Sequence, residues 1–452
     1  MKHNGNFVTA VLLLALASFA QTPLSASSRD FDVCDYGAKG DGAADCTAAI
    51  QTAIEACAAA GGGRVVVPSG GVYKTYTLKL RNDVELHIAR GATLKGGEDP
   101  LRYEEFGPTD VWNVERSIRF NKRAMFYTCG ATNVAITGAG TIDGNAEAFH
   151  HKSEKRNWTG YNWWRNSDTN ITGRCVFFVG CRDVRMDDVL IYHPSGWSTF
   201  FLDCERVGIR GVRIETRREF PNGDGLHFGA CRDVTVSDCI IDSMDDSLIV
   251  RNHQELLKKH RVCERMVFQN CVLRSEKCAA VRIGYTCDGP VRDILFDNIV
   301  VEQCGNAVLL ELRDIPKPPA EWMDPPRGRG LAVPPPESRV PFSAENIRFS
   351  NFRANCLRDP IFLFIAETER ISFARDISFR GCDFRSAAPP RILCRPGDGI
   401  SNWRFSDVTF DVLKTKGSPR AKAACFENMR DVSFDNVRWN FSEEPSLECS
   451  SR

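Results

Sequence analysis

The sequence lacks an excess of charge of either sign. It contains 58 Lys and Arg against 58 Asp and Glu, so its formal net charge at pH 7 is zero. Proteins that bind nucleic acid or membrane surfaces through bulk charge carry a marked basic excess. We therefore expect neither nucleic acid nor a membrane among the partners of this protein.

Beyond its N-terminus the sequence also lacks an apolar run long enough to cross a bilayer. Lys2 precedes a nearly continuous apolar run over residues 7–17, and residues 18–20 (Ser-Phe-Ala) fit a cleavage site of small residues. A run this short indicates a secretory signal peptide rather than a membrane span. We predict a signal peptide over residues 1–26 and a secreted or periplasmic protein formed by residues 27–452.

Zinc-site spacing is missing among the cysteines. The chain has 19 of them, but no CxxC pair and no Cys/His cluster with the spacing of a zinc site. An odd number leaves at least one thiol unpaired within the chain, although an exported protein can form disulfides. The cysteines therefore predict no metal centre.

The sequence does contain a short phrase that recurs along the chain. Within each copy apolar and polar residues alternate, and this period of two is typical of a strand with one buried face. The copies begin at Ala131 (ATNVAITGAGTI), Cys181 (CRDVRMDDVLI), Cys204 (CERVGIRGVRI), Cys231 (CRDVTVSDCII), Cys263 (CERMVFQNCVL), Val291 (VRDILFDNIVV), Ala344 (AENIRFSNF), Ala374 (ARDISFRGCDF) and Met429 (MRDVSFDNVRW).

The spacing of the copies indicates stacked coils. From Cys181 to Val291 the intervals are 23, 27, 32 and 28 residues. No copy can bury its apolar face alone, whereas stacked coils form one continuous core. We predict an all-β protein, a right-handed parallel β-helix of a single chain. The leading cysteines would then stack inside as a ladder of thiols, with disulfides between adjacent coils as the alternative.

Two segments depart from the repeat. Residues 46–59 carry apolar residues at helical spacing after Asp45, a plausible N-cap, and end at residues 61–63, three glycines. We predict a short helix that covers the open N-terminal end of the solenoid. Residues 316–341 contain nine prolines and predict a long loop inserted between coils, either a spacer or a cleft wall around Trp322.

Three carboxylates recur about one coil apart. Asp224 precedes the adjacent pair Asp245 and Asp246 by 21 and 22 residues. Both members of the pair can face Asp224 only if the chain bends near residues 244–247, because consecutive strand residues point to opposite faces. Aspartates are also common in turns, so a structural role is the alternative. Grouped carboxylates resist simultaneous ionisation, and one can then donate a proton while another acts as a base, as glycoside hydrolysis requires.

Several phrases together resemble glycoside hydrolase family 28, the polygalacturonases and their relatives. The resemblance runs from about residue 31 to residue 315 and, through the repeats, more loosely to the end. The phrases are FDVCDYGAKGDGAADCTAAIQTAI from Phe31, VAITGAGTIDGN from Val134 with Trp163-Trp164 after it, HPSGW from His193 (similar to "SPxW"), PNGDGLH from Pro221 (similar to "PNTDGI") and SMDDS from Ser243 (similar to "GDD").

The resemblance implies a function and roles for particular residues. Asp245 would protonate the glycosidic oxygen, while Asp224 and Asp246 would hold and activate water on the opposite face and so invert the anomeric centre. Asn222 would position this group. The family works without metal or cofactor, so we predict none. The partner would be a polysaccharide or oligosaccharide substrate bound by a monomer.

Two family phrases are absent. Ala279 stands where the histidine of "GHG" would be, and Leu309 and Glu311 stand where the Arg and Lys of "RIK" would be. In polygalacturonases these cations contact the carboxylate of the sugar, so their loss argues against a galacturonate at that subsite. Glu311 would suit a neutral or cationic sugar face.

Three further residues are candidates for substrate binding. Arg251 and Arg282 are the nearest replacements for the missing cations, with solvated coil residues as the alternative interpretation. His227 could donate a hydrogen bond to a sugar hydroxyl or assist the acid, and it could equally be structural.

Two other functions compete with hydrolysis. A β-helix polysaccharide lyase would need a Lys or Arg base and usually calcium, and no basic residue accompanies the three aspartates in a matching motif. A carbohydrate-binding solenoid without activity stays an alternative because the His, Arg and Lys are missing. We predict an exported inverting hydrolase of a pectic or related polysaccharide.

Overall fold

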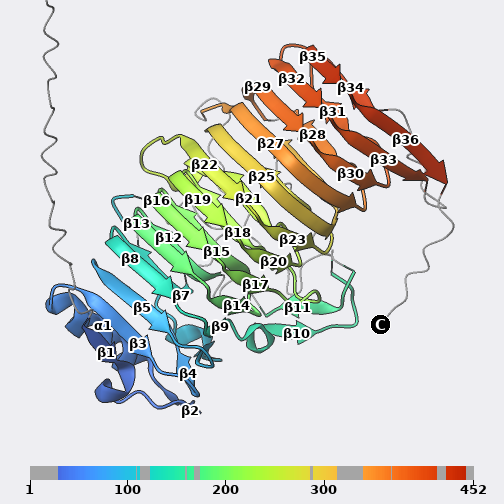
Figure 1. Ribbon diagram of the computed structural model, residues 1–452. Coiled ribbons are helices and arrows are strands. Elements are labelled where there is room, and N and C mark those ends of the chain that lie inside the picture. Colours follow the sequence, from blue (N-terminus) through green and yellow to red (C-terminus); the bar gives the residue numbers. More distant parts are fainter. Residues whose placement is uncertain are drawn as a thin grey trace, which may run out of the picture.

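The chain winds into one long solenoid of parallel strands (Figure 1). This computed structural model describes residues 29–443 apart from 108, 112–122, 158–159, 167–173, 286–288, 313–339, 368 and 415–423. The predicted signal peptide and nearly all of the proline-rich insertion lie outside the described residues. The division of the chain at residue 26 therefore stays a prediction.

The coils contribute strands to three parallel stacks, two of which begin at the N-terminal end and the third at residue 124. Because every strand pairs with its counterpart one coil later, apolar side chains at equivalent positions lie above one another inside the solenoid. The predicted parallel β-helix is confirmed.

The first stack contains β1 (Asp30–Asp32), β3 (Gly63–Val67), β5 (Val84–Ile88), β8 (Thr132–Thr137), β13 (Arg182–Asp187), β16 (Glu205–Arg210), β19 (Arg232–Ser237), β22 (Cys263–Gln269), β29 (Ile371–Arg380), β32 (Ile400–Ser406) and β35 (Arg430–Asp435). The second contains β2 (Asp41–Asp45), β4 (Val72–Thr75), β6 (Thr93–Gly96), β9 (Thr141–Asp143), β14 (Leu190–Tyr192), β17 (Arg213–Glu215), β20 (Ile240–Ser243), β23 (Val272–Ser275), β30 (Asp383–Ser386), β33 (Thr409–Lys414) and β36 (Arg438–Glu443). Two long strands belong to both, β25 (Pro290–Cys304) and β27 (Phe342–Cys356).

The third stack carries the residues of functional interest. It contains β7 (Ala124–Cys129), β12 (Arg174–Val179), β15 (Trp197–Leu202), β18 (Leu226–Gly229), β21 (Leu248–Arg251), β24 (Ala279–Ile283), β26 (Asn306–Leu312), β28 (Ile361–Ile365), β31 (Arg391–Leu393) and β34 (Cys425–Phe426). An antiparallel hairpin of β10 (His150–Lys152) and β11 (Trp163–Arg165) leaves the solenoid between β9 and β12.

One helix, α1 (Thr47–Ala59), lies at the N-terminal end of the solenoid, as predicted (Figure 1). Its side chains Ile50, Ile54 and Cys57 are buried in the core. The N-cap position is Cys46 rather than the predicted Asp45. Asp45 nevertheless accepts a hydrogen bond from the Thr47 amide at 2.9 Å, so its carboxylate still satisfies a free N–H of the first turn.

The recurring Asp of the repeated phrase has a backbone role. Asp183, Asp233 and Asp293 have φ between 53° and 58°, a left-handed conformation that Asp tolerates better than most residues. Where the phrase has arginine instead, as at Arg206, the conformation is kept (φ 53°). Arg206 then makes two hydrogen bonds to Asp183 one coil earlier, at 2.6 and 2.8 Å. The phrase is therefore a turn signal as much as a strand signal.

The leading cysteines lie inside, as a ladder of thiols. Cys181, Cys204 and Cys231 are fully buried, and their sulfurs donate to backbone carbonyls at 3.2–3.4 Å. All 17 cysteines in the part of the chain that the structure describes are free thiols, so the alternative of disulfides between coils is not found there. No helix within that part is long and apolar enough to cross a membrane.

Candidate active site

The three aspartates lie at the turns that lead into the third stack. Asp224 lies two residues before the start of β18, and Asp246 lies two residues before the start of β21. These two strands are neighbours, and their first residues, Leu226 and Leu248, pair in register. The amide of Gly225 donates to the carbonyl of Asp246 at 2.8 Å. One full coil therefore brings Asp224 beside the pair, as the sequence predicts.

The chain bends at the adjacent pair, which lets both carboxylates face the same side. The amides of Met244 and Asp245 both donate to the carbonyl of Gly223, each at 3.0 Å. The hydroxyls of Ser243 and Ser275 donate to the carbonyl of Asp245 at 2.9 and 2.7 Å. This backbone network replaces the alternation of a strand and confirms the predicted bend.

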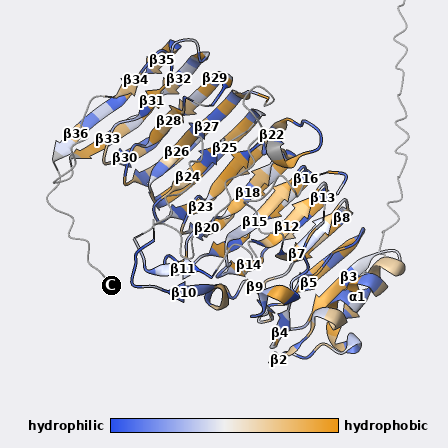
Figure 2. Ribbon diagram, turned by 180° about the vertical axis from the view of Figure 1, so that it is seen from behind, coloured by the Kyte–Doolittle hydropathy of each residue, from blue (hydrophilic) through white to orange (hydrophobic). Residues whose placement is uncertain are grey.

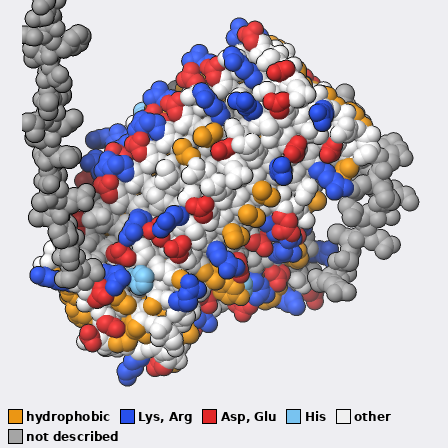
Figure 3. Space-filling model, in the orientation of Figure 1, with side chains coloured by type: hydrophobic (Ala, Val, Ile, Leu, Met, Phe, Trp, Pro, Cys, Tyr) orange, Lys and Arg blue, Asp and Glu red, His pale blue; other side chains and the backbone are white. Residues whose placement is uncertain are grey.

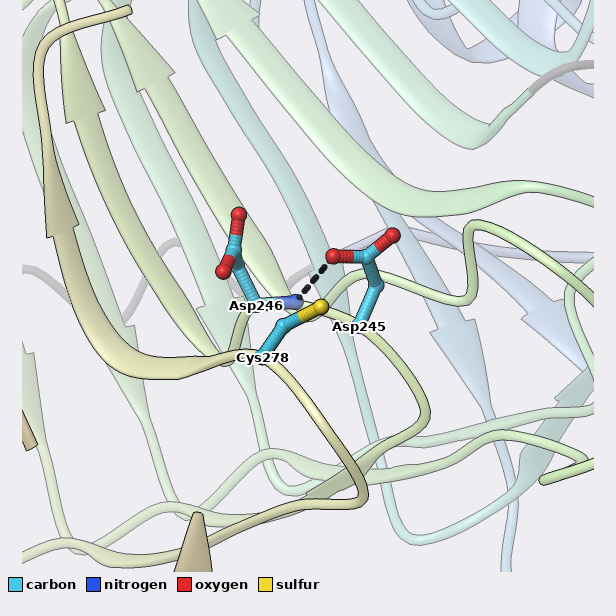
Figure 4. A group of neighbouring side chains, drawn as sticks. All are labelled: Asp245, Asp246 and Cys278. Atoms are coloured by element: carbon cyan, nitrogen blue, oxygen red, sulfur yellow. Dashed lines mark hydrogen bonds between the residues drawn. The ribbon is translucent and has the colours of Figure 1, made fainter. Parts of the chain in front are cut away.

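Asp245 and Asp246 have different hydrogen-bond partners, and Figure 4 shows the bond that joins them, from the Asp246 amide to Asp245. Asp245 accepts from the amide of Asp246 at 3.0 Å and from the side chain of Asn222 at 3.3 Å. Asp246 accepts from the amide of Ala279 at 2.8 Å and from Nε of Arg282 at 2.5 Å. Asp246 thus makes a charge-assisted hydrogen bond to a guanidinium, whereas Asp245 has no cation at hydrogen-bond distance among the described residues.

Burial and mutual repulsion raise two carboxyl pKa values. Burial, followed by the charge of Asp246, raises the pKa of Asp245 to about 6. Burial, followed by the charges of Asp245 and Asp246, raises the pKa of Asp224 well above its usual range. Both groups interact closely enough to titrate together, so a proton is retained within the group at a pH where isolated aspartates are ionised.

Cys278 is a member of the cluster that sequence analysis did not identify. One oxygen of Asp245, one of Asp246 and the sulfur of Cys278 all lie within 4.8 Å of one another (Figure 4). These atoms could hold a divalent cation only after the thiol loses its proton. Burial and the two aspartates raise the pKa of Cys278 well above its usual range, and Arg282 already neutralises Asp246. The cluster is therefore better suited to sharing protons than to binding a metal.

Arg282 and Glu311 form an ion pair rather than a pair of independent substrate contacts. Nη1 of Arg282 donates to Glu311 at 3.0 Å, and the two side chains are 11% and 12% exposed. The interpretation of Arg282 as a solvated coil residue is wrong, because Asp246 and Glu311 hold it in the cluster. Arg251 is also buried, and its guanidinium and that of Arg282 lie 4.9 and 4.8 Å from the ring of Tyr285.

His227 lies beneath an aromatic ring. It is 1% exposed, its ring centroid is 4.1 Å from that of Trp197, and its Nε2 lies 3.4 Å from Nε2 of His253. Burial and the charge of Arg251 lower its pKa well below the usual range, so it is neutral. This position favours the structural interpretation of His227, as support for Trp197. The HPSGW phrase was the signal that could have pointed to Trp197.

Comparisons with known proteins point to one enzyme family. Residues 57–266 match the family described as "Glycosyl hydrolases family 28". The chain is similar to an exo-poly-alpha-D-galacturonosidase of Dickeya chrysanthemi, with 27% identity over 331 residues. That match covers 65% of this chain and 54% of the Dickeya enzyme. Residues 57–266 of this chain belong to glycosyl hydrolase family 28.

Solved structures support the fold of this family 28 member. The hyperthermoactive exopolygalacturonase from Thermotoga maritima superposes with a TM-score of 0.67 at 21% identity, over 91% of this chain and 92% of that one. The family 28 exopolygalacturonase of Yersinia enterocolitica gives 0.61 at 18% identity, over 90% and 78%. The resemblance seen in the sequence is confirmed, and this chain is a divergent member without the "GHG" and "RIK" phrases.

Proposed function

We propose that this family 28 chain is an exported glycoside hydrolase that cleaves a pectic or related polysaccharide with inversion at the anomeric carbon. Asp245 is the general acid, Asp224 and Asp246 hold and activate the water, and Asn222 positions Asp245. The convergence of the three carboxylates at one bend of the solenoid carries this proposal.

The raised pKa of Asp245 supports its role as the acid. A pKa of about 6 keeps Asp245 largely protonated in mildly acidic solution, where it can donate to the glycosidic oxygen as the C–O bond breaks. Arg282 and the amide of Ala279 hold the carboxylate of Asp246 in place, where it can accept a proton from the attacking water. Water attacks the anomeric carbon on the face opposite the leaving oxygen, and its second proton stays on the new hydroxyl. No step requires a metal or cofactor.

The proposal also specifies the stereochemical course, which is inversion at the anomeric carbon. Most inverting glycosidases separate their two carboxyl groups by about 6.5–9.5 Å, whereas one oxygen each of Asp245 and Asp246 lie within 4.8 Å. The water therefore fits beside Asp224 and Asp246 rather than between Asp245 and Asp246. Family membership supports inversion, and the anomer released first is its direct test.

Two observations support the substrate class: the names of the relatives, and the absence of cations at positions 309 and 311. The Dickeya relative is named for its action on poly-galacturonate, and this supports a pectic polymer. Leu309 and Glu311 cannot replace two cations, and Glu311 is held by Arg282. The subsite on that side therefore suits a sugar without a carboxylate. Export rests on the basic, apolar N-terminal segment, and we propose that the chain acts as a monomer.

A screen of purified protein on a panel of polysaccharides tests the function. We expect new reducing ends without the ultraviolet absorbance of an unsaturated uronate, and NMR of the first product should show the inverted anomer. Asp245→Asn should lower turnover at least about a hundredfold, since a positioned acid contributes roughly 10²–10⁴ in rate.

Each competing function predicts a different result. An unsaturated product would indicate a lyase. Binding of a glycan without any product would indicate a carbohydrate-binding solenoid. Turnover unchanged in Asp245→Asn would remove this residue from the mechanism.

A further inference from the structure

Cys304 and Cys356 lie side by side on neighbouring coils. They end the long strands β25 and β27, which are adjacent in the solenoid (Figure 1), and the two residues pair in register. Their sulfur atoms lie 3.7 Å apart. Neither residue is a leading cysteine of the repeated phrase, so this contact is separate from the ladder of thiols.

The backbone at this pair suits a disulfide. Paired strands lie about 4.8 Å apart, which falls within the roughly 4.4–6.8 Å that separates the Cα atoms of a disulfide. The thiol of Cys304 donates to the sulfur of Cys356, so the two side chains already point toward one another. Because a disulfide bond is about 2.05 Å long, oxidation has to bring the sulfurs closer by only about 1.7 Å.

Both thiols are buried in the core, with exposed fractions of 0% for Cys304 and 7% for Cys356. Burial, followed by the hydrogen bond and the charge of Cys304, raises the pKa of the Cys356 thiol well above its usual range. The thiolate, which is the form that attacks a disulfide, is therefore scarce in the folded chain. We expect oxidation to take place during folding, before β27 packs against β25.

A bond between these cysteines would close a long loop. They are 52 positions apart in the sequence. The segment between them contains β26, which carries Glu311, and the proline-rich insertion. A cross-link over a long segment restricts the unfolded chain more than one over a short segment, and so favours the folded state. The bond would therefore tie the coil of Glu311 to the next coil.

We propose that Cys304 and Cys356 are oxidised to a disulfide that stabilises the solenoid across the proline-rich insertion. Each thiol loses one proton and one electron, and the two electrons and two protons convert one molecule of a disulfide oxidant, such as glutathione disulfide, into two thiols. The inference rests on the export proposed for this chain, because disulfides persist in oxidising compartments.

Peptide mapping tests the bond in the full-length chain. The protein is refolded in a buffer of glutathione and glutathione disulfide, its free thiols are blocked with iodoacetamide, and it is digested with trypsin without reductant. We expect residues 293–313, which contain Cys304, to be linked to residues 354–358, which contain Cys356. A reductant should separate the two peptides. Recovery of both as alkylated single peptides, or linked to other cysteines, would overturn the proposal.

Melting temperatures test the stabilising effect. The oxidised chain should melt about 3–8 °C above the reduced chain, because the cross-link restricts the unfolded state. Cys304→Ala should abolish this difference. An equal melting temperature of the oxidised and reduced wild type would show that the bond does not stabilise the fold, and would also overturn the proposal.

Cys382→Ala is the matched control. Cys382 is fully buried, and its sulfur donates to backbone carbonyls at 3.4 and 3.5 Å. Its replacement removes a buried thiol of the same kind, yet the linked peptide and the difference between oxidised and reduced chains should remain. Neither measurement needs a substrate or a secreting host, so a failure of the proposed hydrolysis or export would leave this test intact.

Discussion

The side chains on the outer face of the third stack change from apolar to charged along the solenoid. One register row runs through Phe177, Phe200, His227, Ile249 and Arg282 on successive coils. At its N-terminal end this row is apolar and fully buried under Leu256 and other residues of a separate cluster. At Arg282 the same row carries a charged network. Figure 2 shows hydrophobic and hydrophilic residues interspersed along the strands, and Figure 3 shows charged side chains of both signs distributed over one face of the molecule.

The two ends are equivalent in backbone register, so their difference lies in the side chains and in the segments that cover them. Phe177 and Phe200 stack with centroids 5.1 Å apart, and burial of such rings stabilises the fold. The ions at the other end are buried at a cost in solvation that only mutual pairing offsets. We interpret the first end as structural and the second as functional. The following changes test this interpretation.

Arg282→Met should have the largest effect. It leaves the buried carboxylates of Asp246 and Glu311 without their shared cation, so we expect a loss of about 3–5 kcal/mol in the free energy of unfolding. Turnover should also fall by about 10² or more, because Asp246 loses the guanidinium that holds its carboxylate in position. Urea unfolding and kcat measure the two effects. Glu311→Gln keeps the Arg282–Asp246 pair and should therefore lose less unfolding free energy and less kcat. Losses equal to those of Arg282→Met would contradict the assigned role of that pair.

Leu202→Ala should affect stability alone. Leu202 is fully buried in the apolar cluster, and such a truncation costs about 2–5 kcal/mol. Turnover of the folded protein should stay within about threefold, because the cluster plays no part in the chemistry. Leu357→Ala is the matched control, since Leu357 is 53% exposed and its truncation should cost less than about 0.5 kcal/mol. A large loss of turnover in Leu202→Ala would show that the two ends are coupled.

The pH dependence of stability should identify the charged end. The pKa of Asp245 is raised to about 6 in the folded chain against about 3.9 when unfolded, so the folded state binds more protons between these values. The stability that this group contributes is fully present below about pH 4 and is lost as the pH rises through 6. Melting temperatures of Asp245→Asn should therefore fall less steeply over this range than those of the wild type. Parallel curves would contradict the raised pKa.

Cys278→Ala should have the smallest effect. The thiol donates a hydrogen bond that lowers the pKa of Asp245, in opposition to burial. Its removal should move the alkaline limit of activity upward by about half a pH unit, the equivalent of one weak hydrogen bond. Cys278→Ser keeps a hydrogen-bond donor to Asp245 and should leave the pH profile of activity unchanged. A downward shift in Cys278→Ala would mean that the thiol does not donate to Asp245.

Much of the architecture is encoded locally. The copies of the repeated phrase mark the strands, and their intervals of one coil predict that Asp224 meets Asp245 and Asp246. This works because parallel strands pair in fixed register, so distance along the chain converts directly into position on the solenoid. The helix over residues 47–59 follows from its own periodicity in the same way.

The partners of each charge were decided only by the tertiary structure. Nothing in the spacing indicates that Arg282 joins Asp246 to Glu311, or that Arg165 reaches Pro221 from a hairpin more than fifty residues earlier. Such contacts depend on how far insertions project and on which rotamers the packing allows, and neither repeats with the coil. The sequence therefore determined where the acids converge, while the folded chain determined which of them keeps its proton, because burial and neighbouring charges set that balance.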